Sequence, residues 1–335
     1  MADGDQLDQP TPEGGDDRPG EPTPTATTVL GEGAWTYDWQ DRPRPFVHPV
    51  RTPAGHVLTV DAPADHPWHH ALWFTIKLVD GDNFWEEFGE FGLLRQEAPP
   101  SVAHVGHGAE RAASDLVWVR PDGRVAVRQH LVLTHHPIAA DGHALDWEVT
   151  LVADDEVTYD RTPFTTWGGY GGLTLRGRPD WHDTVLRLPD GTPHERVLGD
   201  RAPWCALAGP IAAPAAGDQT AEPSAAEGSD AGAGHDEDPI VGMAIFDHPA
   251  NPRFPTPWYA STRADTYGQD GWSNFANAAF LWDEALTVPA GEVLHLRHRV
   301  VVHDGPWEAD RMQAEWDRWV AIGGGPGAAA GGTAP

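Results

Sequence analysis

The feature that most limits the possible folds is a series of short segments in which apolar and polar residues alternate. Residues 145–151 alternate strictly, and residues 293–303 place apolar residues opposite His and Arg. Turn sequences such as Pro121-Asp122-Gly123 separate several segments, and the clear helix is the last element, 307–320. More than ten strands without interleaved helices predict an all-β fold, an antiparallel β-sandwich or barrel, with one C-terminal α-helix. The further strand candidates are 45–50, 56–60, 72–79, 115–120, 124–134, 170–176, 184–188, 240–246 and 257–261.

Three stretches of the chain lack the large apolar residues that folding needs. Residues 1–28 and 211–239 each contain seven acidic residues, and residues 322–335 consist mainly of Gly and Ala. Burial in such segments cannot offset the conformational entropy lost on ordering. We therefore expect a single domain over 29–321, with a disordered acidic insertion at 211–239 and disordered tails at 1–28 and 322–335.

The strongly acidic composition narrows the possible partners. Lys and Arg number 22 against 51 Asp and Glu, which gives a formal net charge of −29. Such a chain repels phosphate backbones and anionic lipid, so we expect neither a nucleic-acid nor a membrane partner. A single cysteine, Cys205, excludes an intramolecular disulfide. No spanning apolar segment and no signal peptide is visible, which predicts a cytoplasmic protein.

Residues capable of chemistry concentrate in two segments that share the tripeptide Asp-His-Pro. The first is Asp65-His66-Pro67-Trp68-His69-His70, which follows His48 and Arg51. The second runs from Asp247-His248-Pro249 to Trp258-Tyr259 and includes Asn251 and Arg253. Imidazoles titrate near neutral pH and could act as general acid or base. They could equally ligate a divalent metal, with Asp65 as an oxygen ligand or as the group that fixes a histidine tautomer.

Each of these features also has a structural interpretation. Most of the 18 histidines are expected to be surface or core groups, and the spacing matches no standard zinc motif. The prolines of the second segment could simply make a rigid crossover. Indoles beside polar residues, such as those of Trp68, Trp73 and Trp258, could stack on a sugar ring. Glu86 and Glu87 face opposite ways on a strand, so at most one of them enters a cleft.

The residues around both tripeptides resemble a known family. The runs Pro45–Gly55 and Asp65–His70, followed by Leu72-Trp73-Phe74, are similar to the opening motif of the bacterial PmoA-like family. Later matches are Phe246–Pro249, Pro257–Tyr259 and Val301–Gly305. The resemblance implies a large antiparallel β-sandwich of the galactose-mutarotase-like supersandwich type, and hence carbohydrate handling. The family's methane oxygenase label does not suit a chain without a membrane span, and Trp167-Gly168-Gly169 stands where many members carry a glutamate.

We therefore predict a carbohydrate-active enzyme, an epimerase, lyase or hydrolase, that uses acid–base chemistry on a small carbohydrate-like substrate. The candidate catalytic residues are Asp65, His66, His69 and His70, with His66 or His69 transferring a proton and Asp65 orienting it. The candidate substrate-binding residues are His48, Arg51, Trp68, Trp73, Glu87, Asp247, His248, Asn251, Arg253, Trp258 and Tyr259. One alternative is a metal-dependent hydrolase, lyase or oxygenase with an unknown divalent metal on His48, His66 and His69. The other is a non-catalytic carbohydrate-binding or sensing protein.

Overall fold

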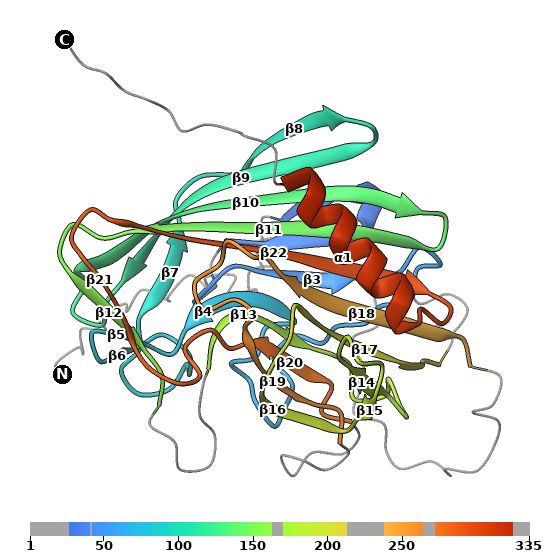
Figure 1. Cartoon of the computed structure of the whole chain (residues 1–335). Coiled ribbons are helices and arrows are strands. Elements are labelled where there is room, and N and C mark those ends of the chain that lie inside the picture. Colours follow the sequence, from blue (N-terminus) through green and yellow to red (C-terminus); the bar gives the residue numbers. More distant parts are fainter. Residues whose placement is uncertain (1–26, 41, 163–169, 213–237, 264–271, 324–335) are drawn as a thin grey trace, which may run out of the picture.

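The computed structural model describes residues 27–40, 42–162, 170–212, 238–263 and 272–323. These residues form antiparallel sheets and one α-helix, α1 (Ala309–Gly323), which lies across the larger sheet (Figure 1). A 3-10 turn, η1 (Gly31–Gly33), follows the first strand.

The strands pair in three antiparallel sheets within the described residues. In order across the eight-stranded sheet lie β1 (Thr27–Leu30), β2 (Trp35–Asp38), β3 (Phe46–Val50), β4 (Leu72–Ile76), β13 (Gly171–Arg176), β20 (Phe275–Ala278), β19 (Pro257–Ser261) and β16 (Arg196–Arg201). In order across the ten-stranded sheet lie β15 (Pro193–His194), β14 (Val185–Arg187), β17 (Trp204–Pro210), β18 (Ile240–Asp247), β22 (Val293–Asp304), β11 (Gly142–Val152), β10 (Val125–Ala139), β9 (Ala109–Val119) and β7 (Leu93–Gln96), with β8 (Ser101–Gly106) also paired to β9. The small sheet contains β21 (Leu286–Val288), β12 (Val157–Asp160), β5 (Leu78–Val79) and β6 (Asp82–Asn83).

Three apolar clusters hold these layers together. The main core lies between the two large sheets and includes Leu72 from β4 and Trp147 from β11. A second cluster lies between α1 and the outer face of the ten-stranded sheet, where Phe246 meets Trp319. A third cluster covers the outer face of the eight-stranded sheet and includes Trp73. Alternate residues of one strand therefore serve two different clusters, as the period of two along a strand requires.

The predicted all-β sandwich with one C-terminal helix is confirmed. Residues 145–151 and 293–303 lie in β11 and β22, which pair directly. The strand predicted at 56–60 is wrong in detail, because these residues make only isolated bridges to Arg51 and Gly177, two different partners. The helix predicted at 307–320 begins at Ala309, two residues later than expected, and the Trp307 ring, which precedes the helix, stacks on His303.

Most of the three segments predicted to be disordered lies outside the described residues. At their edges the structure corrects the boundaries: Thr28 already pairs with Tyr37 in the first hairpin, and α1 continues to Gly323. Ile211 donates its backbone N–H to Pro239 O at 3.1 Å, so the ends of the expected insertion lie together. Among the described residues, no helix is both long and apolar enough to cross a membrane. The cytoplasmic location stays a prediction.

Candidate active site

The outer face of the eight-stranded sheet combines buried aromatic and polar side chains. Along β4, Leu72 and Phe74 point into the main core, so Trp73 between them points outward. Strand pairing aligns Phe46 with Trp73, Arg176 with Phe275 and Tyr259 with Asn277, and all of these side chains are buried. Because water does not reach such a face, its polar groups must find partners in the segments that cover it.

The segment 61–70 folds back over this face and carries the first Asp-His-Pro motif. Its two ends meet in an isolated antiparallel bridge between Asp61 and His70. A tight turn forms between them, in which His69 N donates to His66 O at 2.9 Å. This turn stacks the two imidazole rings of His66 and His69, with centroids 4.5 Å apart and planes 24° apart.

A chain of three polar side chains links the sheet to the surface. Arg176, which is 1% exposed, donates from Nη2 to Asp65 Oδ2 at 2.7 Å, and the same oxygen lies 2.7 Å from His66 Nδ1. Burial would raise the pKa of Asp65, but the hydrogen bonds and positive charges of His66 and Arg176 outweigh it and hold that pKa below its usual value. Asp65 is therefore an ionised acceptor, and it orients the His66 ring with Nδ1 toward itself.

His69 lies behind His66 and differs from it in being buried. Its ring packs against Trp73 and Phe275, with centroids 5.2 and 5.3 Å away, and its Nδ1 has no hydrogen-bond partner among the described residues. Burial, together with the nearby Arg176, lowers the pKa of His69 well below 6.5. His69 is therefore a neutral imidazole at neutral pH.

His70 is clamped between two carboxylates. Its Nδ1 lies 2.6 Å from Asp61 Oδ1 and its Nε2 lies 2.7 Å from Glu87 Oε1, so both ring nitrogens face acceptors. Arg44, which is fully buried, forms an ion pair with the same Glu87 oxygen at 3.2 Å and donates to Trp85 O at 2.7 Å. Two carboxylate partners favour a doubly protonated ring, so His70 serves as a fixed cation in place of the proton donor or acceptor that we expected.

The titration of His70 provides a test of this arrangement. Burial alone would lower the pKa of His70, but the hydrogen bonds and charges of Asp61 and Glu87 reverse this and raise it above 6.5. The stabilisation from this group is therefore fully present below the unfolded-state pKa and is lost as the pH rises through the higher folded-state pKa. We expect an NMR titration of the His70 ring to show a midpoint above 6.5. A midpoint below that of a model peptide would contradict the clamp.

Aromatic side chains surround the three histidines. Trp68 is partly exposed and lies edge-on to His66, with ring centroids 5.2 Å apart. Next to it, Phe88 is 61% exposed and also meets Trp68 edge-on, at 5.2 Å. Trp73 is fully buried beneath the histidines and so is not open to a ligand, whereas Trp68 keeps the position expected of a stacking residue.

The second Asp-His-Pro motif lies elsewhere in the fold. Asp247, at the end of β18, accepts from Asn251 Nδ2 at 2.6 Å and from Thr256 N at 2.9 Å. Asn251 also bonds both the N–H and the C=O of Arg297 in β22. The His248 ring meets Trp319 of α1 edge-on at 5.2 Å. These contacts fasten a turn to β22 and α1 on the outer face of the ten-stranded sheet, so the three residues do not join the first motif as we expected.

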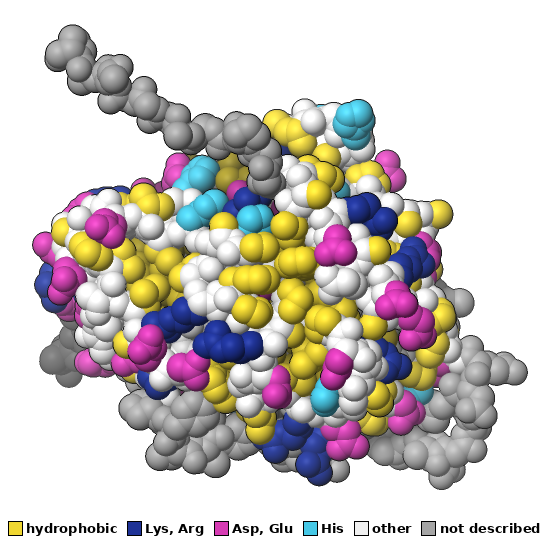
Figure 2. Space-filling model, in the orientation of Figure 1, with side chains coloured by type: hydrophobic (Ala, Val, Ile, Leu, Met, Phe, Trp, Pro, Cys, Tyr) yellow, Lys and Arg dark blue, Asp and Glu magenta, His cyan; other side chains and the backbone are white. Residues whose placement is uncertain are grey.

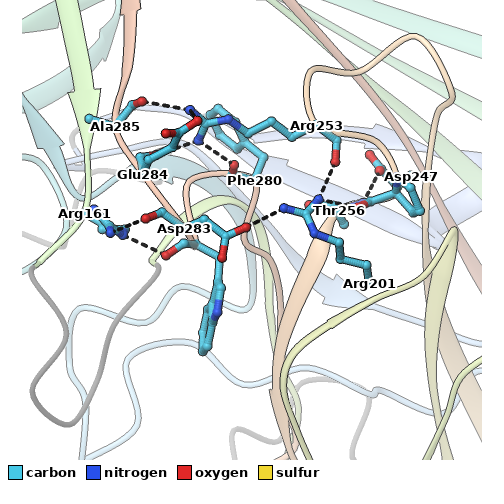
Figure 3. A network of polar contacts seen from close by, with 11 residues as sticks. Arg161, Arg201, Asp247, Arg253, Thr256, Phe280, Asp283, Glu284 and Ala285 are labelled. Atoms are coloured by element: carbon cyan, nitrogen blue, oxygen red, sulfur yellow. Dashed lines mark hydrogen bonds and ion pairs between the residues drawn. The ribbon is translucent and has the colours of Figure 1, made fainter.

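Arg253 also has a structural role in place of the expected substrate contact. Its guanidinium donates to the backbone carbonyl oxygens of Phe280, Glu284 and Ala285, at 3.0, 2.5 and 2.8 Å (Figure 3). Arg201 pairs with Asp283 in the same network (Figure 3). Arg253 therefore holds the segment 280–285 in place.

Trp258 and Tyr259, neighbours on β19, point to opposite sides of the sheet. Trp258 lies in the main core and donates from Nε1 to Ala202 O at 2.9 Å, which rules out the expected stacking on a ligand. Tyr259 belongs to the outer cluster, where its ring stacks on Trp282 at 6.0 Å. Of this pair, Tyr259 alone lies with the first motif.

His48 lies in β3, and Arg51 directly follows that strand. His48 is on the same side of β3 as Phe46, and its Nδ1 is 2.9 Å from Thr59 Oγ1. Arg51 donates to Gly55 O in its own turn at 3.4 Å. The expected role of Arg51 in binding therefore has no support in these contacts.

The expected metal site on His48, His66 and His69 does not fit the side chains present. Among the described residues, no three His, Cys, Asp or Glu side chains are grouped so as to hold a metal ion. The guanidinium of Arg176 beside Asp65 also opposes a second cation at that carboxylate.

Sequence reasoning missed Arg44, Asp61 and Arg176. Arg176 ends β13, whose other residues are small, apolar or Thr, and whose whole length is buried. A charged residue at the end of a buried strand requires a partner, which is the signal that could have found it. The sequence position expected to carry a glutamate in related chains, Trp167–Gly169, lies outside the described residues.

Fold and site together define an all-β sandwich protein with a His, Asp and Arg cluster on the outer face of one sheet. The chain belongs to the family described as a family of unknown function (DUF6807), which its sequence matches over residues 25–317. The resemblance to the PmoA-like family is therefore wrong. It relied on the two Asp-His-Pro motifs, and the second is a turn-forming sequence with a structural role.

The chain was also compared with solved structures and with curated protein sequences. The chain is similar to the solved structure of a galactose mutarotase related enzyme from Lactobacillus acidophilus, with 7% sequence identity and a TM-score of 0.40. The match covers 84% of this chain and 99% of the other. No curated protein sequence matches. At this TM-score the likeness assigns neither an activity nor a site.

Proposed function

We propose that this protein is an enzyme that performs acid–base chemistry on a sugar or sugar derivative at the first Asp-His-Pro motif. The observation that carries the proposal is the chain Arg176–Asp65–His66, with both hydrogen bonds to one Asp65 oxygen at 2.7 Å. An ionised carboxylate at Nδ1 fixes the neutral tautomer whose Nε2 can accept a proton. The same carboxylate stabilises the imidazolium that then forms.

The surroundings of His66 support a role in proton transfer. The ring of His66 is partly exposed, with 20% of its side chain accessible, whereas the stacked His69 is buried and neutral. A neutral neighbour places no further positive charge beside the His66 ring. Partly exposed Trp68 and exposed Phe88 supply an apolar surface for the C–H face of a sugar ring.

The proposed role of His66 predicts a large loss of activity in His66→Gln. The expected result is a loss of about a hundredfold or more in kcat/KM, because general acid–base catalysis contributes about 10²–10⁴-fold. The measurement is turnover of a panel of reducing sugars, glycosides and sugar acids, followed by NMR. The matched control is His130→Gln, since His130 also bonds an aspartate, Asp115 at 2.8 Å, but on an exposed part of β10.

The outcomes separate enzyme from binding protein. Full activity in a folded His66→Gln variant would remove the acid–base assignment. Thermal stabilisation of the wild-type protein by a sugar, with no turnover of any panel member, would replace it with a carbohydrate-binding or sensing role.

A further inference from the structure

A cavity of about 360 Å³ lies between α1 and the outer face of the ten-stranded sheet. The sheet side is lined by His136, Arg297 and Arg299, and the helix side by Arg318 and Trp319. Figure 2 shows the face of the molecule on which α1 lies, with a broad band of apolar side chains bordered by charged groups. The cavity belongs to the opposite outer face from the candidate active site, and its size falls in the lower range of ligand pockets, which is about 300–1,000 Å³.

Two of the three arginines in the cavity are neutralised by carboxylates. Arg299 forms a two-pronged pair with Asp146, at 2.6 and 2.9 Å, and Arg318 pairs with Glu315. Arg297 differs, because its Nε lies 3.7 Å from Glu148 Oε2, too far for a hydrogen bond. That Nε is buried and has no hydrogen-bond partner among the described residues. Arg297 is therefore the least satisfied cation of the cavity.

His248 is not among the residues that line the cavity, but it lies next to Arg297 and presents a second donor beside this guanidinium. Its Nδ1 accepts the backbone N–H of Ala250 at 3.0 Å, so the proton of the neutral ring is on Nε2. Nε2 lies 3.3 Å from Arg297 Nη1, which is also a donor. Burial and the charge of Arg297 lower the pKa of His248 to about 4, so the ring is neutral at pH 7. Two N–H groups that face each other without an acceptor are satisfied together by one anionic oxygen beside them.

We propose that this cavity binds a small organic monocarboxylate, with the carboxylate on Arg297 and His248 and the apolar part against Trp319 and Ile138. The three arginines that line the cavity face the lining carboxylates Asp146 and Glu315, and Glu148 lies 3.7 Å from Arg297, so the cavity carries no large excess of either charge. A singly charged carboxylate is therefore easier to place beside Arg297 than a phosphate dianion, which the neighbouring carboxylates would repel more strongly. The apolar side chains favour a ligand with a hydrocarbon or aromatic part. This site is independent of the proposed active site.

The test is calorimetric titration of the full-length protein with phenylacetate, and with phenylacetamide and inorganic phosphate for comparison. We expect phenylacetate to bind, and its dissociation constant to rise at least about tenfold in Arg297→Gln, because a charge-assisted hydrogen bond is lost. The matched control is Arg128→Gln, an exposed arginine of β10 that pairs with Asp154. That variant should bind phenylacetate as the wild type does.

A second variant protects the test against misfolding. The links from Arg297 to the 247–251 turn use its backbone, so Arg297→Gln should leave them intact. Ile138→Trp, at a partly buried position of the cavity wall, should also abolish binding by filling the space. Unchanged affinity in the folded variants would overturn the site. Equal binding of phenylacetamide, tighter binding of phosphate, or no binding of phenylacetate by the wild type would overturn the proposed ligand class.

Discussion

Replacing Glu87 with glutamine is expected to destabilise the protein by about 3 kcal/mol, because it removes one partner from a buried set of charges. Arg44 is fully buried, and the Glu87 oxygen that it faces at 3.2 Å is also the acceptor 2.7 Å from His70 Nε2. In Glu87→Gln, Asp61 would remain as the carboxylate hydrogen-bonded to His70, and Arg44 would lose its ion pair with Glu87. The measurement is denaturant unfolding at pH 6, where His70 is protonated.

The neighbouring residue provides a matched control for this prediction. Glu86 pairs with Lys77 on the other side of the chain, so Glu86→Gln makes the same chemical change at an adjacent position. Lys77 is 12% exposed, whereas Arg44 and His70 are 0% and 5% exposed, and Glu86 is hydrogen-bonded to one cation where Glu87 contacts two. We therefore expect a loss of about 1 kcal/mol or less. Equal losses in the two variants would show that the clamp around His70 adds no stability. The pKa of His70 should also fall in Glu87→Gln and stay unchanged in Glu86→Gln.

Strands with one face in the main core could be predicted from the sequence with good accuracy. At 145–151 in β11 and at 293–297 in β22 only one face is buried, and this imposes a period of two that is visible in the sequence; from His298 to His303 both faces of β22 are buried. In β4, β13 and β20 every residue is buried, on both faces of the sheet, so no alternation remains. For that reason the sequence did not show which side chains of these strands face the outer cluster.

The candidate site was predicted in part. The sequence indicated the first Asp-His-Pro motif. It also indicated that at most one of the adjacent residues Glu86 and Glu87 would point into the site, because neighbouring residues of an extended chain point to opposite sides. It did not reveal Arg176, which lies 111 positions from Asp65 along the chain. Their contact depends on where β13 pairs with β4 and on the path of the segment 61–70, and no local pattern encodes that pairing.

The aspartates of the two Asp-His-Pro motifs differ in pKa because their neighbouring residues differ. Arg176 and His66 keep the pKa of Asp65 below its usual value. Asp247 accepts hydrogen bonds from the neutral groups Asn251 and Thr256, and burial raises its pKa to about 7. The first carboxylate is thus suited to orienting a proton-transferring histidine, and the second holds a turn.

Gly172→Ala is expected to cost about 3 kcal/mol or more, because steric overlap and an unfavourable backbone conformation act together. Gly172 lies in β13 with a φ of +113°, a region that residues with a Cβ rarely adopt. An added Cβ would lie less than 3.0 Å from the carbonyl oxygen of Ala278, and this backbone atom cannot turn away. The same carbonyl oxygen accepts from Phe280 N at 3.0 Å, so a shift would disturb the start of the 280–285 segment beside Tyr259.

The control for this prediction separates the two contributions. Gly123, in the turn between β9 and β10, has a φ of +87°, and nothing lies within 4 Å of the Cβ that alanine would add. Gly123→Ala therefore tests the backbone conformation alone, for which we expect a loss of about 1 kcal/mol. The measurement is the free energy of unfolding of both variants under one set of conditions. If Gly172→Ala loses no more than Gly123→Ala, the close approach of β13 to Ala278 does not limit which residue can stand at this position.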